Sequence, residues 1–193
     1  MILWSLQPRS VLDLIQRTGR YVCDPEKMSM PEFTKQYDWL AEEMSEQIGP
    51  PPPGVQYPVW AWYIQNGQRK KPDLRKERWC NGPGNEEYAC IELDVPDAQV
   101  VLSDFDAWHI VLGDWLISNS EEEDNQQEIY YDLLSDDQKA DYKRKNWKRV
   151  FDVAPFHNEW TTRGKWVQAT FWELKSEYIQ HVQLFRTACR AKL

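Results

Sequence analysis

Residues 100–115 read VVLSDFDAWHIVLGDW, a stretch in which a short apolar strand passes directly into an amphipathic helix. The large apolar side chains of this helix recur at steps of three, four and three and so share one face: Phe105, Trp108, Leu112 and Trp115. Ser103, with Asp106 three residues later, has the pattern of a helix N-terminus. A strand joined in this way to a helix indicates a protein in which helices pack on a sheet.

The sequence on both sides of this stretch also predicts both strands and helices. Residues 2–7 predict a strand, and Pro8 then opens a helix that ends at Gly19. Residues 33–48 predict a second long helix, because apolar side chains recur there at steps of four and three. Further strands are predicted by β-rich runs at residues 57–63, 89–95, 166–174 and 182–185.

These elements follow one another without regular alternation of strand and helix, so the pattern favours an α+β fold over a parallel doubly wound sheet. A chain of 193 residues is the usual length of one domain. We therefore expect a single α+β domain over residues 1–193, with a small mixed or antiparallel sheet and packed helices.

Composition excludes several classes of protein. With 23 Lys and Arg against 31 Asp and Glu, the formal charge is −8, which disfavours binding of duplex nucleic acid through its phosphates. Hydrophobic residues at 41% are too many for a disordered chain, and no apolar run is long enough to span a membrane. Because no basic region followed by a long apolar stretch is visible near Met1, we expect a cytoplasmic protein.

Tryptophan is unusually abundant, with 11 residues. Each ring buries about 200 Å², so most of the set is expected in the core. The rings that lie on apolar strand or helix faces, and are predicted to be largely buried, are Trp4, Trp60, Trp108 and Trp115.

Four cysteines are scattered along the chain with no CxxC pair: Cys23, Cys80, Cys90 and Cys189. No histidine stands near them at the spacing of a zinc finger, so the sequence predicts no zinc site. In a cytoplasmic protein these thiols are expected to be reduced.

Two charged regions interrupt the apolar pattern. Residues 66–87 carry Gly, Pro, Asn and charge without periodicity, and we predict one long loop that is mobile or ordered by a ligand. Residues 119–128 predict a solvated acidic loop, and a charged helical segment is expected at about 128–149. The basic residues of both regions are bordered by acids, which favours solvated faces, although a small phosphorylated ligand remains an alternative.

Two carboxylates lie inside apolar β segments. Glu92 stands between Ile91 and Leu93, and Glu173 stands between Trp172 and Leu174. Because strand side chains alternate between faces, either carboxylate could point to solvent. In an aromatic cleft, burial would instead raise its pKa and suit it for acid or base catalysis. We take Glu173 as the catalytic candidate.

Four motifs in order resemble an uncharacterised bacterial family, the domain of unknown function numbered 3841. The motifs are the opening ILWSLQP, the segment PVWAWY, the stretch from IELDVP to LSDFDAWH, and the closing VQATFWEL. The resemblance covers essentially the whole chain and implies no established activity.

A more distant resemblance is to the ADP-ribosyltransferase fold, whose members open with a short strand and a helix ending near Gly. This resemblance implies a nucleotide pocket with NAD as a cofactor or substrate. Gln7 or Ser5 would then stand on the first strand, Trp62 or Tyr63 would stack on nicotinamide, and Gln168 or Glu173 would stand near the catalytic acid. The first strand lacks the Arg or His of that fold, and Thr170 stands where its acidic motif has Glu.

Three classes of function therefore remain open. The first is a nucleotide-handling enzyme, the second is a non-catalytic module that binds a nucleotide, peptide or sugar, and the third is a toxin, immunity or regulatory protein that acts through its surface.

Overall fold

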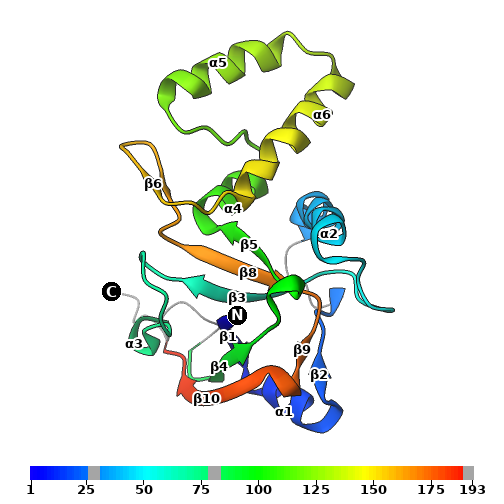
Figure 1. Ribbon diagram of the computed structural model, residues 1–193, viewed down its shortest axis with the longest axis vertical. Coiled ribbons are helices and arrows are strands. Elements are labelled where there is room, and N and C mark those ends of the chain that lie inside the picture. The colour runs from blue at the N-terminus through cyan, green and yellow to red at the C-terminus, as the bar shows by residue number, and fades with distance from the viewer. Residues whose placement is uncertain (26–30, 78–83, 189–193) are drawn as a thin grey trace.

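A six-stranded sheet forms the centre of the protein (Figure 1). The computed structural model describes residues 1–25, 31–77 and 84–188. Within these ranges the strand order is β10-β4-β1-β3-β8-β5, and every neighbouring pair is antiparallel. The strands of this sheet are β1 (Ile2–Pro8), β3 (Val59–Ile64), β4 (Glu87–Asp94), β5 (Val101–Asp104), β8 (Val167–Phe171) and β10 (Ile179–Arg186). Two short antiparallel pairs lie beside it, β2 (Arg20–Tyr21) with β9 (Leu174–Lys175) and β6 (Phe156–His157) with β7 (Thr162–Arg163).

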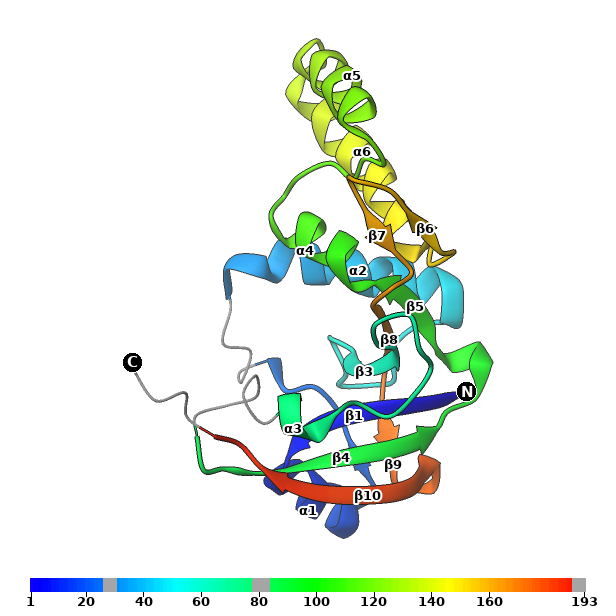
Figure 2. The same cartoon turned by 90° about the vertical axis from the view of Figure 1, so that its left-hand side faces the viewer.

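The helices cover both faces of the sheet, with α1 on one side and α2 and α4 on the other (Figure 2). Their bounds are α1 (Arg9–Thr18), α2 (Thr34–Ile48), α3 (Leu74–Glu77), α4 (Phe105–Leu112), α5 (Glu121–Asp132) and α6 (Asp136–Trp147). The predicted α+β class and the antiparallel alternative for the sheet are both confirmed.

The core on the α1 face is mainly aliphatic. Leu12 and Ile15 of α1 pack there with strand residues such as Leu3, Ile91 and Leu93, and all five are buried. Gly19 ends α1 in the left-handed conformation, with φ 81°, as the sequence predicts.

The core on the α2 and α4 face is built from aromatic rings. Trp39 of α2 and Trp147 of α6 are fully buried, with ring centroids 5.3 Å apart. Trp108 of α4 packs on half-buried Trp60 of β3, also at 5.3 Å. Trp4 and Trp108 are buried as predicted.

Trp115 contradicts the prediction of burial, because 68% of its surface is exposed. The expected helix face ends at Leu112, and Asp114 then turns the chain with φ 59°. The three-residue step from Leu112 to Trp115 therefore crosses a turn, and the ring lies against Gly113 on the surface.

Helices α5 and α6 form a hairpin that projects from the body of the protein (Figure 1). The expected loop at residues 119–128 is wrong, since α5 begins at Glu121. Ser120 caps it by accepting the Glu123 N–H at 3.1 Å. The hairpin is held at its base, where Arg149 forms an ion pair with Glu123 and Asn146 donates to the Ile117 carbonyl.

In the region predicted as one long loop, residues 66–87, the described part contains a short bridge between Gln65 and Gln68 and the single turn of α3. Residues 78–83 of this region lie outside the described residues. Cys23 and Cys90 are free thiols, whereas Cys80 and Cys189 lie outside the described residues. None of the helices in the described part of the chain combines the length and apolar character needed to cross a lipid bilayer.

Replacing Trp108 tests the aromatic core. Trp108→Ala is expected to lower the free energy of unfolding by about 3 to 5 kcal/mol, because the buried ring leaves a cavity. Trp115→Ala is the matched control and should change stability by no more than about 0.5 kcal/mol, because that ring is exposed. Urea denaturation followed by circular dichroism measures both. A loss below about 1 kcal/mol for Trp108→Ala would contradict the assignment.

Candidate functional site

The register of the sheet aligns six residues in one row that crosses all six strands. Successive members are direct partners in neighbouring strands: His181, Glu92, Trp4, Trp62, Gln168 and Ser103. Directly opposite residues in antiparallel strands project on the same face. We call these six residues the cross-strand row, and it lies on the face that carries α2 and α4.

Three aromatic rings gather around the row at Trp62. The Trp62 ring centroid lies 5.2 Å from that of Phe105 and 6.1 Å from that of Trp166. Phe105 opens α4 directly after β5, and Trp166 precedes β8, so the ends of two neighbouring strands bring these rings together. All three rings are half-buried, so part of the surface of each remains exposed to solvent.

Two polar atoms next to these rings are buried and lack hydrogen-bond partners among the described residues: Gln168 Oε1 and Ser103 Oγ. Ser103 is only 1% exposed. A buried polar atom without a partner costs about 1 to 3 kcal/mol, so such atoms are uncommon unless a ligand, ion or water completes them.

The row also carries a carboxylate. Glu92 Oε2 accepts a hydrogen bond from the Trp4 indole nitrogen at 3.1 Å. On the neighbouring strand, Gln183 accepts a hydrogen bond from Lys71 at 2.5 Å. This contact brings a cation from the long loop to the edge of the sheet beside Glu92, since Gln183 pairs with Cys90.

Of the residues that the sequence suggests for a ligand, the structure brings Trp62 and Gln168 together and places three others elsewhere. Ser5 is buried and donates to the Trp60 carbonyl, while Gln7 donates to Ser5 Oγ. Tyr63 packs against the aliphatic core and against the Arg69 guanidinium, 4.6 Å from its ring centroid. Because strand residues alternate between faces, Ser5 and Tyr63 lie on the face opposite the row.

Glu173 lies at the end of the sheet where β3 begins, just after Phe171, which pairs with Val59. Tyr63 is four residues further along β3 than Val59, about 14 Å at roughly 3.4 Å per residue. The Glu173 carboxylate pairs with Arg20 at 2.5 Å and lies 3.9 Å from Lys175. It lines a separate hollow of about 260 Å³ beside the Pro50 turn. The structure therefore separates the expected catalytic acid from Trp62 and Tyr63.

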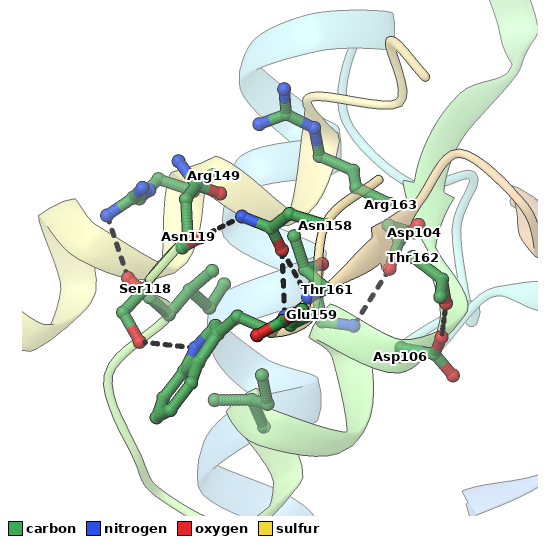
Figure 3. A pocket seen from close by; sticks show the side chains of 14 residues that line it. Asp104, Asp106, Ser118, Asn119, Arg149, Asn158, Glu159, Thr161, Thr162 and Arg163 are labelled. Atoms are coloured by element: carbon green, nitrogen blue, oxygen red, sulfur yellow. Dashed lines mark hydrogen bonds between the residues drawn. The ribbon is translucent and has the colours of Figure 1, made fainter. Parts of the chain in front are cut away.

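A second hollow, of about 290 Å³, lies where the start of α4 meets the base of the α5–α6 hairpin and the β6–β7 hairpin (Figure 3). Asp104 is the buried carboxylate on its wall, and it accepts the N–H groups of Ala107 at 2.9 Å and Gly164 at 2.7 Å. Burial raises the pKa of the Asp104 carboxyl above its ordinary value, although both hydrogen bonds act in the opposite direction. Gly164 has φ 79°, and an added Cβ would lie 2.8 Å from the Val153 carbonyl oxygen.

Comparison with protein families gives one assignment. The model of the family described as Domain of unknown function (DUF3841) matches residues 2–180. The chain belongs to this family. Neither the comparison with curated proteins nor the comparison with solved structures gives a match.

The part of the chain that matches DUF3841 contains five of the six residues of the row and leaves out only His181. It also contains every residue of the hollow in Figure 3. In the described ranges, no group of three or more His, Cys, Asp or Glu side chains is arranged to hold a metal ion.

The sequence motifs do not assign Ser103, Phe105 and Trp166 to this candidate site of the DUF3841 protein. The helix pattern places Phe105 in the helix core and Ser103 at the helix cap, where Asp104 in fact accepts the capping N–H. The two-residue spacing of Trp166 and Gln168 was a usable signal, because it puts both side chains on one face of a strand.

The pH dependence of stability tests the burial of Asp104. Because the folded-state pKa is raised, the contribution of Asp104 to stability is fully present below its unfolded pKa of about 3.9 and is lost as the pH rises through the folded pKa. The unfolding free energy of the wild type minus that of Asp104→Asn should therefore decrease as the pH rises from the acid side. Denaturant titrations at several pH values measure this difference, and an increase with pH would contradict the assignment.

Proposed function

We propose that this protein binds a nucleotide-like ligand whose planar ring stacks among Trp62, Trp166 and Phe105. The observation that carries the proposal is the pair of buried, unpartnered polar atoms, Gln168 Oε1 and Ser103 Oγ, directly beside these rings. Aromatic rings with a few convergent polar atoms are the usual lining of a small-molecule site.

The hydrogen-bonding chemistry of Gln168 Oε1 and Ser103 Oγ indicates which polar groups the ligand ring should have. The Gln168 oxygen accepts hydrogen bonds only, and the Ser103 hydroxyl both donates and accepts. The exocyclic amine of a base would donate to Gln168 Oε1, and the ring nitrogen beside that amine would accept from the Ser103 hydroxyl. The carboxamide of nicotinamide would do the same through its NH2 group and its oxygen. Stacking of one base on an aromatic side chain contributes about 1 to 3 kcal/mol.

Glu92, at the other end of the row, suits the ribose and phosphate of a nucleotide. Glu92 and Gln168 are three strand spacings apart, about 14 Å at roughly 4.8 Å per strand. A ribose placed towards Glu92 would donate its hydroxyl groups to the carboxylate, and Lys71 beside that strand offers a positive charge for a phosphate.

Cleavage of NAD is a second candidate function, and the position of Glu92 favours it. A carboxylate near the ribose stabilises the positive charge that develops when the bond to nicotinamide breaks. Glu92 shares the row with Trp62, whereas Glu173 lies at another hollow and pairs with Arg20. If this protein releases nicotinamide, Glu92 is therefore the better candidate for the acid.

Trp62→Ala tests the binding proposal. We expect the wild type to bind ADP or NAD with quenching of tryptophan fluorescence, and Trp62→Ala to raise the Kd about 5- to 150-fold, because one stacking partner is lost. Gln168→Ala should weaken binding about 5-fold or more, because it removes the acceptor. Isothermal titration calorimetry measures each Kd. Trp115→Ala is the control, since it also removes one tryptophan ring but at an exposed position outside the row.

Absence of binding to ADP and NAD at millimolar concentration would contradict the proposal, as would equal Kd values for Trp62→Ala and Trp115→Ala.

Nicotinamide release from NAD separates an enzyme from a binding module. If turnover occurs, Glu92→Gln should abolish it and leave the Kd within about 5-fold, because the amide keeps the shape of the side chain and loses its charge. Glu173→Gln should leave turnover within about 2-fold, because that carboxylate does not face the row. Chromatography of the released nicotinamide measures both, and loss of turnover in Glu173→Gln alone would restore Glu173 as the catalytic acid. Binding without turnover in the wild type would assign the protein to the non-catalytic class.

A further inference from the structure

Two hollows adjoin each other between α4, the α5–α6 hairpin and the β6–β7 hairpin. One is the hollow of about 290 Å³ in Figure 3, and the other, of about 460 Å³, extends along the base of α5 and α6. Ile110, Ser118 and Trp160 line both hollows and so form a wall that the two share. We call this pair the joined hollows.

The lining of the joined hollows includes large apolar side chains that reach solvent. Trp115 is 68% exposed and Trp160 is 46% exposed, and half-buried Leu116 and Tyr131 lie beside them. The Trp160 ring is held in place, because its indole nitrogen donates to Ser118 Oγ at 3.1 Å and Ser118 donates to Asp124 at 2.8 Å. Exposed aromatic rings whose position is fixed by hydrogen bonds are typical anchors of protein interfaces.

Each cation in this lining already has a carboxylate partner. Arg149 pairs with Glu123 at 2.8 Å, and Arg163 pairs with Asp152 at 2.7 Å. Lys143 pairs with Asp114 at 3.0 Å. The positive charge of the hollows is therefore neutralised within the protein.

Four exposed or half-exposed carboxylates of the lining have no ion-pair partner in the described part of the chain: Asp106, Glu159, Asp124 and Glu128. Asp106 accepts a hydrogen bond from Thr162 and Asp124 accepts one from Ser118, and both contacts are with neutral groups. Two of these carboxylates line each hollow, which gives the joined hollows an excess of negative charge.

We infer that the joined hollows bind a cationic segment of another protein, in which an apolar side chain packs on Trp115 and Trp160 while flanking Lys or Arg side chains pair with these carboxylates. The charge of the lining supplies the complementarity, and the exposed rings supply the apolar contact. Phosphate-bearing ligands are repelled by the same carboxylates. This surface is separate from the cross-strand row, so either inference can fail without the other.

The test uses a short fluorescein-labelled peptide of alternating Arg and Leu, with fluorescence anisotropy as the measurement. The full-length wild type should bind it, more weakly as salt is added. The variant Asp124→Asn with Glu128→Gln should raise the Kd about 5-fold, since each exposed ion pair contributes a factor of roughly 1.5 to 5. Trp115→Ala should raise it about 5-fold or more, because an aromatic anchor is lost.

A matched variant removes the same charge from α5 outside the hollows, Glu121→Gln with Asp132→Asn, and should change the Kd by less than about 2-fold. Asn at position 124 still accepts the Ser118 hydroxyl, and thermal unfolding checks that every variant folds. Equal weakening by the two double variants would show long-range attraction only and would overturn the inference. Equal binding of an alternating Arg and Ser peptide, no effect of Trp115→Ala, or no binding by the wild type would also overturn it.

Discussion

The pairing of Trp4 with Trp62 joins the two halves of the sheet, and the arrangement of both faces depends on it. β1 carries β4 and β10 on one side, and β3 carries β8 and β5 on the other. Because side chains alternate along a strand, a slip of one residue between β1 and β3 would move every side chain of one half to the opposite face. If the β3 half moved, Trp62 and Gln168 would lie on the α1 face, and small apolar residues such as Ala61 and Ala169 would face α2 and α4 instead.

The two cores differ in the kind of side chain that fills them. The α1 face is covered by one short helix and filled by aliphatic residues, among them Leu3, Leu12 and Ile91. The α2 and α4 face is filled by large rings, which need wider spacing and leave edges that smaller side chains do not cover. Trp108 of α4 packs on Trp60 in one part of this face, while Trp62, two residues further along β3, and its neighbour Trp166 stay half-buried. The row that we propose as a ligand site is the continuation of the aromatic core towards solvent.

Acidic residues have three different roles in the structure. Asp104 is buried and ties the start of α4 to Gly164 through backbone N–H groups. Asp114 pairs with Lys35 and Lys143, which lower the pKa of its carboxyl although partial burial acts in the opposite direction. The carboxylates around Trp160 lack such partners in the described ranges, so the net charge of −8 is partly concentrated on one surface. The net charge of the chain does not indicate that these unpaired carboxylates lie on one surface.

The sequence by itself determined the α+β class, a helix that begins at Phe105 and the burial of Trp4 and Trp108, because periodicity and helix-end residues act over a few neighbouring positions. It also indicated Trp62 and Gln168, although only through a resemblance. Other features depended on tertiary structure. The exposure of Trp115 follows from a turn at Asp114, and the alignment of Glu92 with Trp4 and Trp62 follows from strand order and register. Strand order and register depend on contacts between residues far apart in the chain, and a local pattern does not indicate which strands become neighbours.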